Sequence, residues 1–138
     1  MLGAATRYDG KSKTAISESD LKRLYERFQL VPFCPEIYGG LPTPRVPSER
    51  VGERVKMKDG RDVTDNFLKG ASEALYMCRV LNIKKALLKA KSPSCAKYEI
   101  YDGGFNGNLK EGKGVAAELL LENGISVFDE NEIEDLMA

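Results

Sequence analysis

Two of the three cysteines stand next to prolines, in segments that we expect to be stiff loops. Cys34 lies in V-P-F-C-P-E, which continues into G-G-L-P-T-P-R, and Cys95 ends the segment S-P-S-C. A proline fixes its own backbone dihedral, restricts the residue before it and lacks an N–H donor. Each sulfur is therefore expected on a preset loop instead of on the buried face of a helix or strand. Thiolates held in this way are suited to binding a metal ion or an iron–sulfur cluster.

The absence of histidine excludes several classes of catalysis. A Ser-His-Asp or Cys-His pair cannot form, and neither can a histidine-ligated zinc site or an imidazole general base. The groups that remain are carboxylates, thiolates, hydroxyls, lysine and arginine. A disulfide framework is not expected, because three cysteines are an odd number and the predicted compartment is reducing.

Length and charge limit the domain count and the partners. The 138 residues suit one domain, so we expect residues 1–138 to form a single unit. Lys plus Arg and Asp plus Glu each total 21, so no net field attracts nucleic acid or an anionic membrane. No apolar run approaches the ~18 residues of a membrane span, and the start lacks the pattern of a signal peptide. We therefore expect a cytoplasmic protein.

The elements before the first cysteine loop follow from hydrophobic periodicity. A helix is predicted from Glu18 to Phe28, with Ser17 as its cap, and a short buried strand from Leu30 to Phe33. Cys34 thus follows the end of a predicted strand. The four prolines within 35–49 exclude regular structure from the segment that comes next.

The middle of the chain reads as a hairpin followed by a long helix. The hairpin, within residues 51–63, is predicted to turn at Asp59-Gly60. The helix is predicted to begin with Thr64 as its cap and to end near Leu81. Cys78 falls on the apolar face of this helix. We interpret it mainly as a small buried hydrophobe, with a redox or ligand role as the alternative.

The second cysteine loop also follows a predicted strand. Residues 84–89 form that strand, which runs directly into S-P-S-C. A helix over 114–123 comes next, with Gly124 at its C-terminus, then a strand over 125–128 and an acidic helix over 129–137.

This alternation of strands and helices predicts an α/β fold with a mostly parallel sheet covered on both faces. In such sheets ligands bind beyond the carboxyl ends of the strands. Cys34 and Cys95 each follow a predicted strand, so both are expected at that edge. The sequence therefore predicts one site between the two cysteine loops.

Five motifs, in order along the chain, resemble the thiouracil desulfidase family, which was long catalogued as a domain of unknown function. They are L-G-x-x-x-R-Y-D-G at Leu2 to Gly10, C-P-E-x-x-G-G-L-P-T-P-R at Cys34 to Arg45, G-x-D-V-T-x-x-F-x-x-G-A at Gly60 to Ala71, S-P-S-C at Ser92 to Cys95, and I-Y-D-G-x-F at Ile100 to Phe105. The resemblance spans nearly the whole chain. It implies a three-layer, Rossmann-like α/β domain.

The resemblance also implies a cytosolic enzyme that removes sulfur from thiolated uracil without net redox change, using a four-iron, four-sulfur (4Fe-4S) cluster held by three cysteines. By position, Cys34 and Cys95 would be two of the metal ligands, and Glu36 and Ser94 the catalytic pair beside them. An iron without a protein ligand is a Lewis acid suited to a soft thiocarbonyl sulfur. Glu36 would then activate water as a general base, with Ser94 relaying or positioning the proton.

Arg45, Arg7 and Thr43 are the candidate substrate-binding residues. The two arginines are suited to contact a phosphate or a uracil oxygen, and the alternative for each is an ion pair with a nearby carboxylate. The expected substrate is a small thiolated nucleobase or nucleoside. A thiolated tRNA is less favoured, because a tRNA binder usually has a basic surface.

The chain departs from the family pattern at its start. The first ligand of the family is a cysteine that ends an opening strand just before the Leu-Gly step, and here Met1 stands directly before Leu2. Three interpretations remain open. The strand and the ligand lie upstream, or the chain is a cluster-free module that binds a nucleobase or nucleotide, or Cys78 substitutes. A missing opening strand would leave an exposed sheet edge, which favours a homodimer.

Two further points bear on the metal site. The residue after the second cysteine is Ala96, where the family usually has glycine, so the backbone beside the ligand loop is expected to be tighter. A mononuclear metal such as zinc, held by Cys34, Cys95 and Glu36, is a third class of site that the sequence allows.

Overall fold

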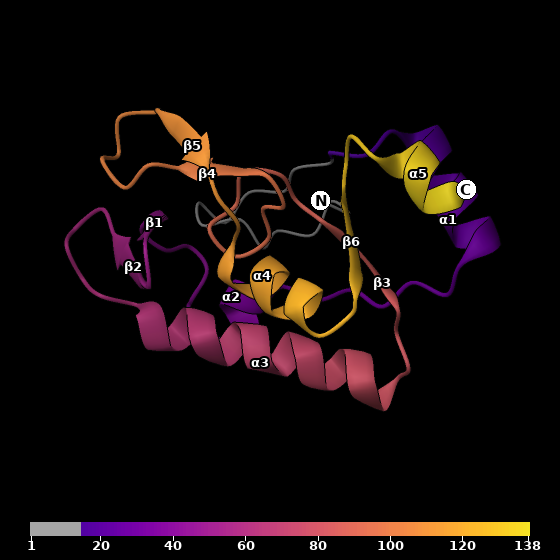
Figure 1. Cartoon of the computed structure of the whole chain (residues 1–138), viewed down its shortest axis with the longest axis horizontal. Coiled ribbons are helices and arrows are strands. Elements are labelled where there is room, and N and C mark those ends of the chain that lie inside the picture. Colours follow the sequence, from indigo (N-terminus) through magenta and orange to yellow (C-terminus); the bar gives the residue numbers. More distant parts are fainter. Residues whose placement is uncertain (1–14) are drawn as a thin grey trace.

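The computed structural model describes residues 15–138 (Figure 1). The motif at 2–10, including Arg7, lies outside the described residues. The described elements, in chain order, are α1 (Glu18–Arg27), α2 (Pro35–Tyr38), β1 (Ser48–Val51), β2 (Arg54–Met57), α3 (Thr64–Val80), β3 (Lys85–Leu88), β4 (Glu99–Tyr101), β5 (Leu109–Glu111), α4 (Val115–Glu122), β6 (Ser126–Asp129) and α5 (Ile133–Met137). Among these helices none is long and apolar enough to cross a membrane.

A parallel pair of strands, β3 and β6, lies between two groups of helices. Lys85 pairs with Ser126 at the start of the ladder. Side chains on successive residues point to opposite faces of a sheet. On one face, the side chains of Ala86, Leu88 and Val127 pack against α3 and α4. On the other face, those of Leu87 and Phe128 pack against α1 and α5. The predicted α/β class and parallel pairing are confirmed.

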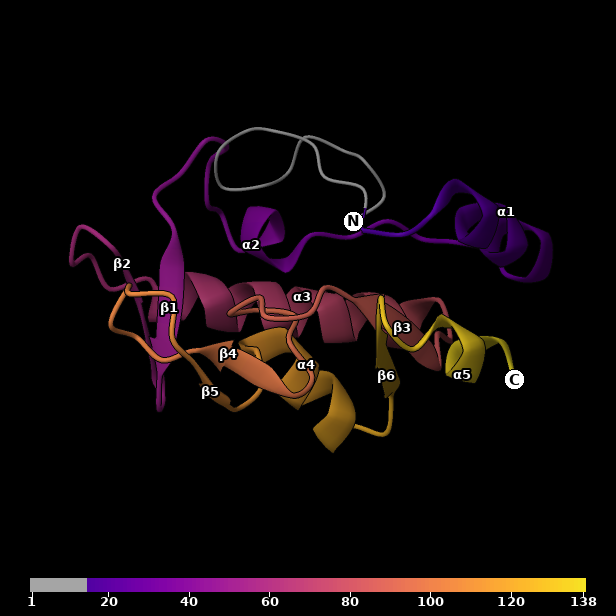
Figure 2. The ribbon, with the colours of Figure 1, turned by 90° about the horizontal axis from the view of Figure 1, so that it is seen from above.

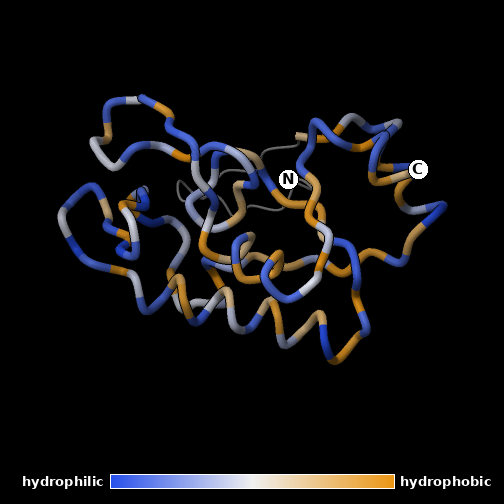
Figure 3. The backbone as a smooth tube through the Cα atoms, viewed as in Figure 1, coloured by the Kyte–Doolittle hydropathy of each residue, from blue (hydrophilic) through white to orange (hydrophobic). Residues whose placement is uncertain are grey.

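The longest helix, α3, runs along one side of the molecule, and Figure 2 shows it from above. Apolar residues recur every three or four positions, so hydrophobic and hydrophilic segments alternate along it in Figure 3. Its C-terminal half packs on α4 through Leu75 and Cys78. Its N-terminal half packs on β2, with Phe67 in a cluster that includes Val55. Cys78 is 7% exposed, which confirms its interpretation as a buried hydrophobe.

The other two strand pairs are antiparallel. β1 pairs with β2, and β4 pairs with β5, so residues 15–138 contain one parallel and two antiparallel pairs. The Rossmann-like strand order stays a prediction. The predicted turn at Asp59-Gly60 is present, but it supports only an isolated bridge between Lys56 and Asp62. The main hairpin turns earlier, at Gly52, which has a φ of 57°.

The strand predicted from Leu30 to Phe33 is wrong, since the structure assigns no strand to these residues. Pro32 lacks the N–H that a ladder needs. The apolar side chains instead link two cores. Leu30 packs against the α1 and α5 cluster, and Phe33 packs against the α3 and α4 cluster and stacks on Tyr38 with ring centroids 4.2 Å apart.

Two predicted helix starts are also corrected. Thr64 does not cap α3 but is its first residue, because the carboxylate of Asp62 accepts the Thr64 N–H at 2.9 Å. The Thr64 hydroxyl instead accepts the N–H of Val55 at 2.9 Å. The terminal helix begins at Ile133, not at Asp129, because Asp129 belongs to β6 and forms a turn with Glu132.

Candidate active site

The first cysteine loop ends in a single helical turn. Cys34 occupies the N-cap position of α2, and Pro35, which has no N–H to satisfy, occupies the first turn. The Cys34 carbonyl accepts the N–H of Tyr38 at 3.0 Å. This turn directs the backbone so that Glu36 follows the cysteine on the same short helix.

Two glycines allow α2 to lie directly on α3. A Cβ on Gly70 would collide with the carbonyl oxygen of Pro35, and a Cβ on Gly39 would collide with that of Asn66. The Asn66 side chain closes the contact by donating to the Gly39 carbonyl at 2.9 Å. The position of Cys34 and Glu36 is therefore set by close backbone packing against the longest helix.

The second cysteine loop follows β3 and is organised by its own serine. The Ser92 hydroxyl accepts the N–H groups of Ser94 at 3.2 Å and of Cys95 at 3.1 Å. The Ser94 carbonyl in turn accepts from the first turn of α4, at 2.9 Å from the nitrogen of Ala116. A Cβ on Gly114 would collide with the Ser94 and Cys95 backbone. The loop and the N-terminus of α4 thus cap each other.

The carboxylate of Glu36 joins the two loops. Its Oε2 accepts the Ser94 hydroxyl at 3.1 Å, and its Oε1 accepts the Arg45 Nε at 3.2 Å. The Arg45 side chain is 4% exposed and that of Glu36 is 16% exposed. Ser94 is 3% exposed. A charged pair of low exposure therefore lies directly beside a buried hydroxyl.

The two loop cysteines lie close enough for their charges to interact. The pKa of the partly buried Cys95 is raised to about 11: burial is the largest cause, the Ser94 hydroxyl lowers it, and the charges of Glu36 and Cys34 add to the rise. The Ser94 hydroxyl lies 3.5 Å from the Cys95 sulfur. The structure thus brings Cys34, Glu36, Ser94 and Cys95 together, as the sequence analysis expected from their loops.

The thiols of Cys34 and Cys95 are suited to bind a soft metal, but they supply only two ligands. Two thiols converge, and the described part of the chain contains no group of three or more His, Cys, Asp or Glu residues arranged to hold a metal ion. The mononuclear zinc alternative is therefore not supported. Cys78 packs with Leu75, Ala117 and other core residues, which argues against the substitution of Cys78 for a missing ligand.

Of the three candidate substrate-binding residues, the structure describes Arg45 and Thr43. Arg45 donates from Nη1 to the Thr43 hydroxyl at 3.1 Å and to the Pro42 carbonyl at 3.3 Å. Arg45 and Thr43 therefore lie at the edge of the site, on the proline-rich loop. Their contact with substrate stays a prediction, as does that of Arg7.

Three residues that organise the site had no role in the sequence analysis: Ser92, Asn66 and Gly114. Ser92 shows a weak signal, since a serine two residues before another polar residue often forms a hydroxyl-to-backbone turn. Gly114 and Asn66 act through contacts with residues far away in sequence. One sequence without tertiary information does not reveal such contacts.

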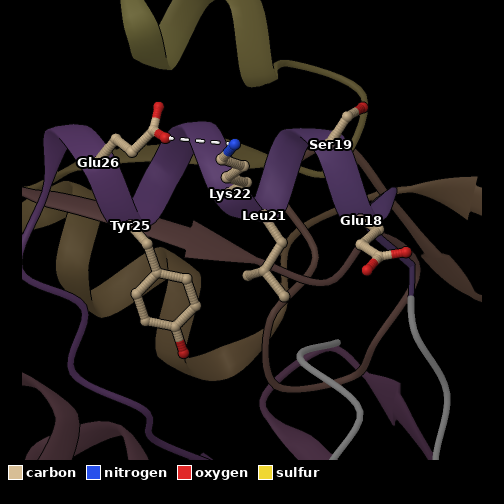
Figure 4. A pocket seen from close by; sticks show the side chains of 6 residues that line it. All are labelled: Glu18, Ser19, Leu21, Lys22, Tyr25 and Glu26. Carbon is tan, nitrogen blue, oxygen red and sulfur yellow. Dashed lines mark ion pairs between the residues drawn. The ribbon is translucent and has the colours of Figure 1, made fainter.

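A shallow hollow on α1 contains none of the predicted site residues. It is lined by Glu18, Ser19, Leu21, Lys22, Tyr25 and Glu26 (Figure 4). Lys22 and Glu26 form an ion pair across it at 3.8 Å. The reactive side chains that meet one another lie at the two cysteine loops instead.

Comparison with known proteins places this arrangement in context. The model of the 2-thiouracil desulfurase family matches residues 1–132. The uncharacterized protein YbbK of Bacillus subtilis (strain 168) is 35% identical over 145 residues, which cover 98% of this chain and 94% of YbbK. The solved structure of TudS, a 4Fe-4S-dependent thiouracil desulfidase, superposes with a TM-score of 0.93 at 46% identity, covering 99% of this chain and 89% of TudS.

Proposed function

Because this chain belongs to the 2-thiouracil desulfurase family, we propose that it is an iron–sulfur-dependent desulfidase that exchanges the sulfur of a thiolated uracil for oxygen. The thiocarbonyl and water give a carbonyl and hydrogen sulfide, so no electrons are transferred. The observation that carries the proposal is the Glu36 carboxylate, which accepts the Ser94 hydroxyl at 3.1 Å beside the Cys95 sulfur.

Cys34 and Cys95 fit two ligand positions of a 4Fe-4S cluster. Thiolates are soft ligands, the two cysteines lie close enough for their charges to interact, and both stand on loops held by backbone hydrogen bonds. In the family pattern the third ligand is a cysteine just before the Leu-Gly step. A bound cluster would supply a Lewis-acidic iron suited to a soft thiocarbonyl sulfur.

Glu36 and Ser94 carry the proton chemistry in this proposal. A carboxylate within hydrogen-bond reach of a hydroxyl can take a proton from water that lies next to both groups. Glu36 Oε2 is the accepting atom, and the Ser94 hydroxyl orients the water or passes its proton. The low exposure of both groups strengthens these hydrogen bonds.

The substrate class follows from size and charge. A small thiolated base or nucleoside, such as thiouracil or thiouridine, is favoured over a thiolated tRNA, because the sequence has no net positive charge. Arg7 and Thr43 are the proposed substrate-binding residues, while Arg45 donates to Glu36 and to Thr43. We further propose a cytoplasmic location and a homodimer.

The test is anaerobic reconstitution with iron and sulfide, followed by a thiouracil turnover assay. It uses this chain and a form extended upstream to include the third cysteine. A brown chromophore, uracil and sulfide are expected, and Glu36→Gln and Ser94→Ala should each lower kcat by roughly 100-fold. Cys78→Ala is the matched cysteine control and should keep the cluster. Absence of both chromophore and uracil from the extended form would end the enzyme proposal.

The second candidate is a cluster-free module that binds a nucleobase or nucleotide. The convergence of only two thiols within residues 15–138 favours it. It predicts that the iron-free chain binds thiouracil and that Cys34 reacts as a free thiol. Calorimetry of the iron-free protein with thiouracil separates it from the enzyme.

A further inference from the structure

Arg45 is held in a network of low exposure that begins at the catalytic carboxylate. Its Nε donates to Glu36 Oε1 at 3.2 Å, and its Nη1 donates to the Thr43 hydroxyl at 3.1 Å and to the Pro42 carbonyl at 3.3 Å. With a side chain only 4% exposed, the guanidinium needs partners that compensate for its lost hydration. Glu36 is a charged partner that meets this need.

We propose that Arg45 is a positioning residue, which fixes the Glu36 carboxylate so that its second oxygen faces Ser94. The last torsion of a glutamate side chain is broad, so the carboxylate is free to turn unless one oxygen is held. Arg45 holds Oε1, and Oε2 then lies 3.1 Å from the Ser94 hydroxyl. This inference rests on the proposed function, in which Glu36 handles the proton.

The same geometry argues against a substrate phosphate on Nε or Nη1 of Arg45. A phosphate on Nε would have to displace Glu36, and one on Nη1 would have to displace Thr43 and Pro42. The planar fork of an arginine is suited to hold a carboxylate and a neighbouring loop together, which a lysine ammonium does not reproduce. Arg45 therefore ties the proline-rich loop to α2 at the catalytic carboxylate.

The test compares Arg45→Lys with Arg23→Lys in the reconstituted enzyme. Arg23 also binds carboxylates, Glu134 and Asp20, but on α1 and α5. Arg45→Lys is expected to lower kcat by roughly 10- to 100-fold with KM within about twofold and with iron content unchanged. Arg23→Lys should match the wild type. The double variant Arg45→Lys with Glu36→Gln should be no slower than Glu36→Gln alone, because both changes remove one function.

Two kinetic outcomes would overturn the proposal. A raised KM with kcat retained would make Arg45 a substrate contact. A fall in kcat that follows lost iron or a lower Tm would make it a structural residue.

A crystal structure of Arg45→Lys gives a readout that does not need turnover. The Glu36 carboxylate should turn so that its oxygens lie beyond hydrogen-bond range of the Ser94 hydroxyl, about 3.5 Å. A distance that stays at 3.1 Å would refute the positioning role. If the wild type fails to convert thiouracil, the proposed function fails, while this comparison still decides what Arg45 holds.

Discussion

Ser92 organises the second cysteine loop although its hydroxyl has no role in the proposed chemistry. It accepts the N–H groups of both Ser94 and Cys95 and lies 3.0 Å from the Ser94 hydroxyl. Ser92→Ala would leave these backbone donors without their partner. We expect a loss of about 1 kcal/mol in the free energy of unfolding, measured by urea titration. A loss of kcat without a loss of stability would instead assign Ser92 to the reaction.

Gly114 is needed for space and not for its backbone conformation. Its φ of −68° is open to any residue, but a Cβ there would collide with the backbone of Ser94 and Cys95. Gly114→Ala is therefore expected to destabilise the protein by about 1 to 3 kcal/mol and to reduce cluster loading, measured by iron content after reconstitution.

Gly107→Ala is the matched control. Gly107 has a φ of 80° and open space around its Cα, so alanine there costs only backbone strain, about 1 kcal/mol. It should leave iron content unchanged. Equal iron loss in both variants would contradict the steric explanation.

At the residue scale, the sequence pointed to residues that the structure brings together, but not to the contacts that support them. Cys34, Glu36, Ser94 and Cys95 stand in short motifs whose residue types indicate their chemistry. The partners of Glu36 come from loops distant in sequence, and the ion pair with Arg45 depends on how the proline-rich loop folds back on α2. Such contacts between loops leave no periodic pattern.

At the scale of elements, a partly buried carboxylate ties the end of β6 to the end of β3. Glu130 accepts the N–H of Ala90 at 2.6 Å and pairs with Lys89 at 2.7 Å. Burial raises the pKa of Glu130, but Lys89 and the Ala90 N–H lower it by more, so the net pKa lies below the ordinary 4.5. The folded state therefore binds this proton more weakly than the unfolded chain does.

The stability contributed by Glu130 is present above the unfolded pKa and is lost as the pH falls through the folded pKa. We expect Glu130→Gln to lower the free energy of unfolding near neutral pH and to reduce its dependence on pH below about 4.5. Urea titrations from about pH 7 to pH 3 measure both effects. Glu26→Gln, at an exposed carboxylate 3.8 Å from Lys22, is the control. An unchanged pH profile in Glu130→Gln would refute the assignment.

Elements with a strong period were predicted well, and elements that depend on partners were not. The apolar stripes of α1, α3 and α4 and the short apolar runs of β3 and β6 are local signals. Residues 30–33 have the same apolar character but pack between two cores without a paired strand. The pairing of β1 with β2 was missed because β1 consists mainly of polar, partly buried residues and shows no apolar alternation.

At the scale of the whole molecule, the α1 and α5 cluster is separate from the two cysteine loops. Leu24 is 1% exposed within that cluster, whereas its neighbour Tyr25 is 63% exposed. Leu24→Ala should lower the free energy of unfolding by about 2 to 5 kcal/mol, and Tyr25→Ala by far less. Below the unfolding temperature, kcat should be unchanged in both. A selective loss of kcat in Leu24→Ala would show that this cluster is coupled to the site.

The alternating faces of β3 determine the register of the strand and, through it, the position of the cysteine loop that follows. Moving this strand along β6 by one residue would send Leu87 into the wrong core and bring Ala86 and Leu88 out of the right one. The same slip would carry the sulfur of Cys95 by about 3.3 Å, further than the reach of a hydrogen bond. A chain that retains every motif would therefore still misplace this thiol if β3 paired with β6 one residue out of register.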